Sequence, residues 1–399
     1  MKNHNIPKLR YPEFTDAWEK CKLGKIVKER NEQYPKSNEY PLMAFISGQG
    51  IADKGERYNR DFLVSDEESK KYKRTELDDF IYSSNNLETG SIGLNRYGKA
   101  CISPVYSIFY IDKSNDPYFI GQRLIQKDFI YQMTRYRQGV VYGQWRIHEK
   151  DFLKLSIIRP ALPEQQKIGN LFKQLDRLVT LHKRKWDDVI LLKKALLQKM
   201  FPKNGSDFPE IRFPEFTDAW EKCKLGEVAK YRNGKAHEQN ISTNGQYIVV
   251  NSKFISSNGY VKKYSEYQIE PLYKNDITFV LSDVPNGKAL AKTFLIESDN
   301  LYTLNQRVAA FSTLKNNDSY FLNIILDRNN YFLSFDSGVG QTNLSISDVM
   351  GFNFHIPTLP EQQKIGNLFK QLDRLITLHK RQHEHYQLLK KALLQQMFV

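Results

Sequence analysis

The sequence predicts an α+β fold with two similar mixed α/β domains separated by a long antiparallel two-helix coiled coil, in pseudo-twofold symmetry. Two duplicated segments support this prediction. Residues 12–24 (PEFTDAWEKCKLG) return unchanged at residues 214–226. Residues 162–184 return at residues 359–381 with a single change, from valine to isoleucine. Internal repetition sets the architecture of a chain. Because the interiors between these flanks diverge, one scaffold is used twice to carry two different inserts.

Length and composition allow two folded domains. The 399 residues are 40% hydrophobic and 13% aromatic, which argues against disorder and suffices for two cores. We expect a first domain, a first helical region, a linker, a second domain and a second helical region. Their predicted bounds are 1–158, 159–201, 202–208, 209–355 and 356–399.

The second duplicated segment predicts a long helix in each copy. Pro163 and Glu164 suit a first turn, because that turn does not use the donor that proline lacks and because its positive dipole favours an acid. Apolar residues then recur at 3-4-3 spacing over roughly five heptads, which is typical of a coiled-coil seam. The predicted seam residues are Ile168, Leu171, Leu175, Leu178, Val189, Leu192, Leu196, Ile365, Leu368, Leu372, Leu375, Tyr386, Leu389 and Leu393.

Polar residues interrupt this seam at matching places, His182 with Lys185 and His379 with Gln382. Such positions often fix the register of a coiled coil. The breaker FPKNGS at residues 201–206 ends the first helix. A helix of ~38 residues is ~57 Å long. Since each helix carries one narrow seam, we expect the two to pair antiparallel.

The inserts read as short strands and loops. Runs rich in β-branched and aromatic residues are bounded by Gly, Asn, Asp and Pro, which is typical of strands. These runs are residues 42–46, 80–82, 105–111, 247–250 and 277–281. Short fragments shared by the inserts predict one common fold. The matched fragments are 45–47 with 254–256, 98–100 with 287–289, 122–123 with 306–307, and 143–144 with 340–341.

The charge favours a polyanionic partner. The formal net charge is +14 and the pI is about 9.3, and Lys and Arg bind phosphates with release of counterions. No apolar run approaches the ~20 residues needed to cross a bilayer, and the first residues (MKNHNIPKLR) lack an apolar signal segment. We therefore expect a cytoplasmic protein without a membrane partner.

Motifs for catalysis are incomplete. Residues 93–100 approach the spacing of a phosphate-binding loop, but Ala100 replaces the Ser or Thr that holds magnesium. Residues 116–119 (DPYF) lack one proline of an amino-methyltransferase motif, and residues 68–70 have a nuclease-like E-x-K spacing within a charged run. We interpret these segments as a turn, a helix start and a solvated run.

Metal and disulfide signals are weak. Cys21 and Cys223 are equivalent in the repeat, and no CxxC pair is present, so neither a disulfide framework nor a zinc ribbon is predicted. His379, His383 and His385 share a helix, and a pair four residues apart can bind a metal. The first copy keeps only the first of the three, so we predict no metal site and no catalytic group.

Basic and amide side chains interleaved with aromatics mark the candidate DNA-binding residues. Arg suits guanine edges, Gln and Asn suit adenine edges, and Lys, Ser and Thr suit phosphates. The alternative is an ordinary basic surface. The candidates are Lys70, Lys71, Lys73, Arg74, Arg96, Lys99, Arg135, Arg137, Gln144, Arg146, Lys262, Lys263, Asn286, Lys288, Gln341, Thr342 and Asn343.

The chain resembles the specificity subunit of type I restriction-modification systems over nearly all its length. The resemblance rests on the WEKCKLG entries at 18–24 and 220–226 and on the exits at 160–168 and 357–365, which share P-x-x-P-E-Q-Q-K-I. The GQTNLS stretch at 340–345 also looks typical of the family, whereas the first insert departs from it with GQWRIH at 143–148.

The resemblance implies the function. Each target-recognition domain would bind one half of a split double-stranded DNA sequence, and the paired helices would set the gap between the halves. The subunit would bind no cofactor and catalyse nothing itself. It would dock two methylation subunits, which supply S-adenosylmethionine and adenine methylation, and can recruit restriction subunits that use ATP and magnesium.

Two other classes of function remain open from the residues alone. One is a coiled-coil adaptor that joins two protein-binding domains and ignores DNA. The other is a DNA-acting enzyme in its own right, which the incomplete motifs disfavour. Binding of random duplex DNA that weakens steeply with salt would separate a DNA reader from an adaptor.

Overall fold

The computed structural model describes residues 5–53, 70–140, 144–203 and 205–399. The chain forms two compact units, which we call unit 1 (Met1–Lys183 with Lys380–Val399) and unit 2 (Arg184–His379). Each unit therefore combines one insert with parts of both long helices, α4 (Leu162–Lys199) and α10 (Leu359–Met397). Among the described residues no helix is long and apolar enough to cross a membrane.

Unit 1 is built on a four-stranded antiparallel sheet in the order β2-β10-β7-β8. One face of this sheet packs on Phe152 of α3 through stacked and tilted aromatic rings, namely Phe80, Tyr82 and Phe109. Helices α1 and α2 belong to the same hydrophobic core. The elements are β2 (Val27–Glu29), β7 (Phe80–Tyr82), β8 (Ile92–Leu94), β10 (Ser107–Ile111), α1 (Pro117–Leu124), α2 (Lys127–Thr134) and α3 (Glu149–Phe152).

Smaller sheets complete unit 1. The entry strand β1 pairs with β13, a three-stranded sheet has the order β3-β6-β9, and β4-β5 and β11-β12 are two-stranded. The elements are β1 (Glu19–Lys22), η1 (Leu23–Lys25), β3 (Gln33–Tyr34), β4 (Ala44–Ile46), β5 (Gly50–Ala52), β6 (Tyr72–Thr75), β9 (Ala100–Ile102), β11 (Gln138–Val140), β12 (Gln144–Arg146) and β13 (Ser156–Arg159).

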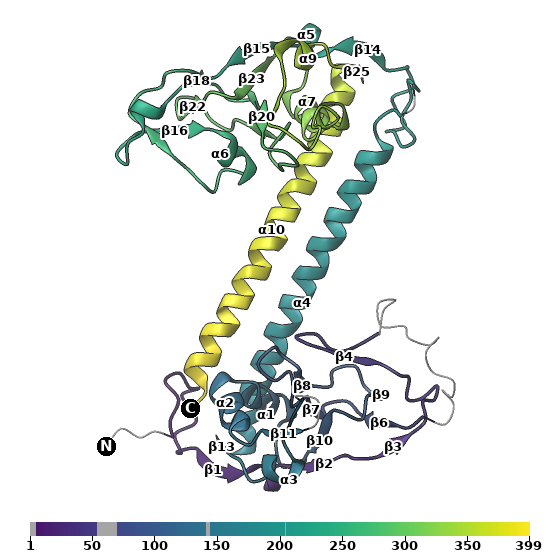
Figure 1. Cartoon of the computed structure of the whole chain (residues 1–399), viewed down its shortest axis with the longest axis vertical. Helices are drawn as coiled ribbons and strands as arrows, with labels where there is room; N and C mark the ends of the chain where they lie inside the picture. Colours follow the sequence, from purple (N-terminus) through teal and green to yellow (C-terminus); the bar gives the residue numbers. More distant parts are fainter. Residues whose placement is uncertain (1–4, 54–69, 141–143, 204) are drawn as a thin grey trace. The chain divides into compact units, whose positions relative to one another are not determined.

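Unit 2 repeats this plan with the strand order β15-β23-β19-β21, and its entry strand β14 pairs with β25 (Figure 1). Its second sheet has four strands, in the order β17-β16-β22-β18, and β20 pairs with β24. The strands are β14 (Glu221–Lys224), β15 (Ala229–Asn233), β16 (Tyr247–Val250), β17 (Tyr264–Ser265), β18 (Pro271–Leu272), β19 (Ile277–Val280), β20 (Ser282–Asp283), β21 (Thr293–Leu295), β22 (Tyr302–Leu304), β23 (Val308–Thr313), β24 (Thr342–Asn343) and β25 (Asn353–Ile356). The matching sheets confirm the predicted pair of similar mixed α/β domains.

Helices α7 to α9 of unit 2 follow in the same order as α1 to α3 of unit 1, and α5, η5 and α6 precede them. These elements are α5 (Leu225–Val228), η5 (Glu238–Asn240), α6 (Ser252–Ser256), α7 (Ser319–Leu326), α8 (Asn330–Leu333) and α9 (Ile346–Met350). The N-caps of α1 and α7 are Asp116 and Asp318, and each accepts a hydrogen bond from the amide three residues on, at 2.8 Å. Because this cap closes the first turn of the helix, α1 and α7 begin at equivalent positions of the repeat.

Three of the fragment matches predicted from the sequence are wrong in structural terms. Residues 45–47 lie at the end of strand β4, whereas residues 254–256 lie on helix α6. Residues 122–123 lie on α1, whereas residues 306–307 lie in the turn before β23. Residues 98–100 lead into β9, but residues 287–289 lie before β21, which corresponds to β8. Short identical fragments arise by chance in a basic, glycine-containing chain, so the strand order decides the equivalence.

The two long helices pack antiparallel (Figure 1). Asp176 of α4 pairs with Lys390 of α10 at 2.6 Å in unit 1. Lys193 of α4 pairs with Asp373 of α10 at 2.5 Å in unit 2. The residue numbers of the partners fall along α10 as they rise along α4, so the predicted antiparallel pairing is confirmed. Asp176 also accepts the hydroxyl of Tyr118, which joins the first insert to both helices.

The predicted apolar seam is buried only in part. Its buried members are Ile168, Leu175, Ile365 and Leu372. Three others need correction, since Leu192, Leu375 and Leu389 are 50%, 41% and 36% exposed; the remaining seam residues are partly buried. Two helices cover only a narrow strip of each other, and a 3.6-residue helix drifts about 20° per heptad from a 3.5-residue repeat. Phe172 and Phe369, outside the predicted seam, are fully buried against the inserts.

A buried carboxylate joins each entry segment to its helix. Glu164, on the first turn of α4, accepts two hydrogen bonds from the Arg10 guanidinium at 2.7 Å and one from the Trp18 indole at 3.3 Å. The same three contacts recur in unit 2 with the same distances. Residues from the two separate duplicated segments therefore meet in one structural joint, which is used twice.

A second buried carboxylate makes the stability of unit 1 depend on pH. Asp79 is 1% exposed and lies 2.8 Å from the Arg30 guanidinium. Burial raises the pKa of Asp79 from 3.8 to about 6, although hydrogen bonds to the Glu76 amide and Arg30 oppose the rise. The folded state thus binds the proton more tightly than the unfolded chain, and the stability due to this group falls as the pH rises from about 4 through 6.

We therefore expect Asp79→Asn to flatten the dependence of unit 1 stability on pH. Between pH 4 and pH 7 the wild-type protein should lose up to about 3 kcal/mol more unfolding free energy than the variant, because the rise in pKa corresponds to about that energy. Urea unfolding of both proteins at several pH values measures the difference. Parallel stability curves for the two proteins would contradict the expectation.

Candidate nucleic-acid interface

In unit 1 the hairpin β11–β12 is anchored to the segment that follows β7. The main-chain N–H of Trp145 donates to the Asn85 side chain at 2.6 Å, and that of Ile147 donates to the Ser84 hydroxyl at 2.9 Å. Arg137 donates to the Ser84 carbonyl at 3.1 Å and also pairs with Glu88. These bonds tie Arg137, before β11, and the end of β12 to the segment that follows β7.

This edge of unit 1 presents aromatic and basic side chains. Trp145 is 48% exposed and lies between Gln144 and Arg146, which are also exposed. On the neighbouring helix α2, Tyr131 is 61% exposed, and the Arg135 guanidinium lies 4.8 Å from its ring centroid. Exposed planar groups next to cations suit stacking and hydrogen bonding to nucleic acid.

In unit 2 two loops are joined by one carboxylate. Asp336 accepts hydrogen bonds from the main-chain N–H of Asn286 at 3.0 Å and of Gly338 at 2.9 Å, and from the Thr342 hydroxyl at 3.2 Å. Asp283 closes the first loop, since it accepts from three main-chain N–H groups of residues 284, 289 and 290 at 2.7–3.1 Å. A Cβ at Gly287 would lie 2.1 Å from Asp283, so this turn requires glycine.

The two interfaces occupy equivalent places in the repeat. Each combines two segments. One follows β7 or β19, which is the second strand of the four-stranded sheet in chain order, and the other precedes the short helix α3 or α9. We call them loop site 1 (residues 84–88 and 138–146, without the undescribed 141–143) and loop site 2 (residues 283–288 and 336–343). Seven predicted DNA-binding residues gather in the two sites: Gln144, Arg146, Asn286, Lys288, Gln341, Thr342 and Asn343.

Two of the predicted DNA-binding residues are corrected by their burial. Lys73 is 6% exposed, donates to the Tyr106 carbonyl at 2.9 Å, and has its pKa lowered by burial. Thr342 is 8% exposed and its hydroxyl is bound to Asp336. Neither side chain can reach DNA without local unfolding. The sequence misled here because residue type alone does not show burial, and Lys73 lies on β6 between buried Tyr72 and partly buried Arg74.

Other predicted residues serve the fold or lie elsewhere. Arg74 is stacked between the rings of Tyr34 and Tyr40, at 4.1 and 4.4 Å. Arg137 holds the hairpin, as described above. The remaining exposed candidates are Lys70 and Lys71 before β6, Arg96 and Lys99 between β8 and β9, paired with Asp78 and Glu39, and Lys262 and Lys263 before β17. Their contact with DNA remains a prediction.

Residues 93–100, which resemble a phosphate-binding loop, form a turn that the side chain of Asn95 closes. Asn95 is fully buried, and its side-chain oxygen accepts the main-chain N–H groups of Tyr97 and Gly98 at 2.9 and 3.0 Å. Its amide donates to the Gly98 carbonyl at 2.7 Å. The N–H groups that would hold a phosphate are therefore occupied. Glu68 and Ser69 of the E-x-K spacing, and Gly143 of the first insert, lie outside the described residues.

Sequence reasoning missed the anchors of these loops, namely Ser84, Asn85, Asp283 and Asp336. The signal was weak but present. Asp336 is followed two residues later by glycine, and an aspartate two residues before a glycine commonly closes a turn with its side chain. No three His, Cys, Asp or Glu side chains of the described ranges lie close enough together to hold a metal ion.

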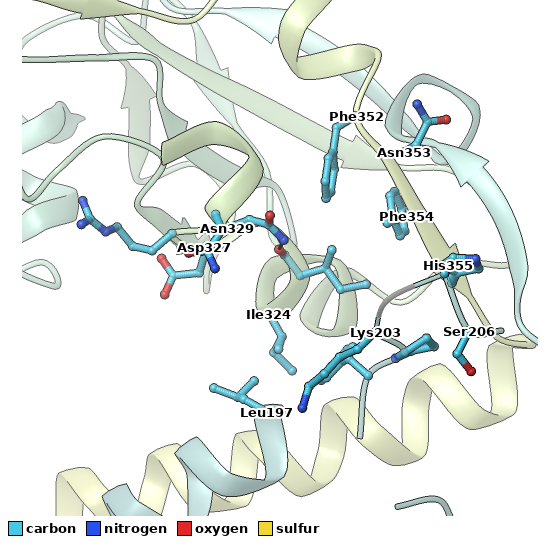
Figure 2. Close-up of a pocket in the computed structure, with 16 residues that line it drawn as sticks. Leu197, Lys203, Ser206, Ile324, Asp327, Asn329, Phe352, Asn353, Phe354 and His355 are labelled. Carbon is cyan, nitrogen blue, oxygen red and sulfur yellow. Dashed lines mark hydrogen bonds between the residues drawn. The ribbon is translucent and has the colours of Figure 1, made fainter. Parts of the chain in front are cut away.

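A cavity of about 620 Å³ in unit 2 lies apart from loop site 2. Figure 2 shows Phe354 and His355 of β25 on one side and Leu197 of α4 on another. Ile324 of α7 and residues 201–203, 205 and 206 also line it. None of the predicted DNA-binding residues is among its lining residues, so this cavity is not part of the candidate interface.

The chain thus contains two recognition domains that share one fold and carry different side chains in their loop sites. A family model of the type I restriction modification DNA specificity domain matches residues 15–191 and 217–385. These ranges cover most of the chain, which therefore belongs to the type I restriction-modification DNA specificity family. The predicted resemblance is confirmed.

The chain is also similar to individual members of this family. The specificity subunit of the type I restriction enzyme MjaVIII from Methanocaldococcus jannaschii is 22% identical over 424 residues, which cover 98% of this chain and 95% of that protein. The crystal structure of a type I restriction-modification system S subunit from M. genitalium matches with a TM-score of 0.65 at 14% identity, over 99% of each chain. At that identity the structural likeness shows the fold alone.

Proposed function

We propose that this specificity subunit reads a DNA sequence in two separate parts, one with each loop site. The chain itself binds no cofactor and catalyses no reaction in this proposal. It docks two methylation subunits, which supply S-adenosylmethionine and methylate adenine, and it can recruit restriction subunits that use ATP and magnesium. The paired helices set the length of the unread DNA between the two parts.

The observation that carries this proposal is that the joints between the duplicated segments are the same in both units, whereas the loop sites are not. The joint around Glu164 and its repeat have the same contacts and distances. The loop sites, in equivalent places, share Gln144 and Gln341 but differ beside them, with Trp145 and Arg146 in one where Thr342 and Asn343 stand in the other. The identical joints suit two equal partner subunits, and loop sites that differ from each other suit two different base sequences.

The duplicated flanks permit a direct test. Replacing residues 25–161 by residues 227–358 gives a chain with the second insert twice, without a change in either flank. In cells that also supply the methylation subunits, the methylated motif mapped genome-wide should become an inverted repeat of the half-site that unit 2 reads. The reciprocal chain, with the first insert twice, serves as control. A motif that keeps two different halves in both chains contradicts the proposal.

Salt dependence and activity separate the other classes of function. The full chain should bind duplex DNA with an affinity that falls steeply between about 50 and 200 mM salt, because several phosphates are neutralised. Indifference to DNA would support an adaptor instead. Methylation or cleavage of DNA by the purified chain without any partner would overturn its non-catalytic assignment.

A further inference from the structure

Loop site 2 ends in an apolar tip. Val339 is 88% exposed, more than any other large apolar side chain of the described residues. It stands between Gly340 and Gly338, whose φ of +73° favours glycine. Since burying a valine gains about 1.5–3 kcal/mol over leaving it in water, an external surface that covers this side chain would gain affinity from it.

The tip is held in place rather than loose. Asp336 binds the Gly338 main-chain N–H at 2.9 Å and joins this loop to the Asn286 main chain. An ideal Cβ on Gly338 would lie 3.4 Å from the amide nitrogen of Asn286, so this exposed amide lies beside the base of the tip. Preorganised groups lose little entropy on binding, which makes them suitable for sequence reading.

A second amide is oriented next to it. The Gln341 side-chain nitrogen donates one hydrogen to the Ser282 hydroxyl at 2.6 Å and the other, at 3.5 Å, to the Asn343 side-chain oxygen. The bond to Asn343 is long and therefore weak, so its N–H and the carbonyl oxygen of exposed Gln341 can turn to a ligand, and these are the two groups that bind the N7 and N6 edge of adenine.

We propose that loop site 2 reads an A·T base pair in the major groove, with Gln341 on the adenine edge and Val339 on the 5-methyl group of thymine at that pair or the next. This inference rests on the proposed function and names the bases that its second half reads. The pair is distinct from the methylated adenine, because methyl transfer requires that base to leave the duplex.

The charges of loop site 2 favour this assignment over a G·C pair. Guanine is read by Arg or Lys and cytosine by a free carboxylate. Both carboxylates of the site, Asp283 and Asp336, are engaged by main-chain N–H groups. Lys288 is exposed on the first loop and suits a backbone phosphate. Amides and a methyl-bearing tip remain, which is the combination that suits A·T.

Removal of the thymine methyl group tests the apolar contact. Once the motif is mapped, the full chain with its methylation subunits is titrated with target duplexes in which uracil replaces each thymine of the half-site of unit 2. One uracil should weaken binding about fourfold, the effect of one buried methyl group. In Val339→Ala the same replacement should have no effect. Val105→Ala, a 71%-exposed valine of unit 1, should keep the full sensitivity.

Removal of the adenine N7 tests the amide contact. A 7-deazaadenine at the read position should weaken wild-type binding by about fivefold, as expected for one lost hydrogen bond. Gln341→Ala should weaken binding to the intact target by about 5- to 150-fold and should respond no further to the analogue. Gln341→Glu, which keeps the size of the side chain, should lose affinity in the same way, since it cannot donate to N7.

The outcomes separate this inference from the proposed function. A two-part motif whose unit 2 half lacks an A·T pair apart from the methylated adenine overturns the inference alone. So does a half-site whose base analogues act equally on wild-type and variant chains. Absence of any two-part motif overturns the proposed function itself.

Discussion

Replacing Glu361 by alanine is expected to lower the free energy of unfolding of unit 2 by about 3–5 kcal/mol. Glu361 is 1% exposed and accepts two hydrogen bonds from Arg212 at 2.7 Å and one from the Trp220 indole at 3.3 Å. These bonds raise the pKa of Arg212 above its usual value. Without the carboxylate, a largely buried guanidinium and an indole N–H lose their acceptor, and that loss is the origin of the large cost.

The repeat supplies the controls for this experiment. Glu164→Ala removes the same joint from unit 1 and should destabilise that unit instead. Glu215 pairs with Lys364, which lies on α10 like Glu361, and its side chain is about half exposed. Glu215→Ala should therefore cost less than about 1 kcal/mol. Hydrogen exchange of the two central sheets assigns each loss to its unit. A cost for Glu361→Ala as small as that for Glu215→Ala would show that the joint is not a main source of stability.

The sequence predicted the helix start at Glu164 but not this joint. A glutamate in a first helical turn is explained by the helix dipole alone, and nothing in the local pattern connects it to an arginine 154 residues earlier. The duplication was the stronger signal. Arg10 and Arg212 both lie two residues before the repeated PEFTDAWEKCKLG segment, yet pairing of two distant segments requires the fold.

The same limit applies to the seam and the loops. Heptad spacing predicted which residues face the partner helix. Phe172 and Phe369 instead pack in the cores of the inserts, and the spacing along one helix cannot show that second contact surface. In the loop sites, amides and basic residues were predicted as DNA contacts by type. Only the hydrogen bonds of Asp336 and Ser84 show which loops meet.

Replacing Phe398 by alanine is expected to lower the free energy of unfolding of unit 1 by about 3–5 kcal/mol. Phe398 follows α10 and is 7% exposed, with its ring 5.1 Å from that of Phe119, 5.7 Å from Phe172 and 6.3 Å from Trp18. The Leu9 main-chain N–H also donates to the Gln396 carbonyl at 2.9 Å. The variant therefore leaves a cavity in the core of the first domain.

The expectation is specific because Phe398 belongs to the second copy of the repeat. Hydrogen exchange should accelerate in the strands of unit 1, such as β7 and β10, and remain unchanged in β19 and β23 of unit 2. Phe201→Ala is the matched variant, since Phe201 follows α4 and packs on Trp220 and Phe321 of unit 2 at 6.0 and 5.8 Å. Its cost should be smaller, because Phe201 is partly exposed and borders the cavity of about 620 Å³. If Phe398→Ala accelerated exchange in unit 2 instead, the assignment of the end of α10 to the core of unit 1 would be refuted. If it holds, each recognition domain depends for its core on the helix that begins in the other, so that neither half of the chain completes its fold alone.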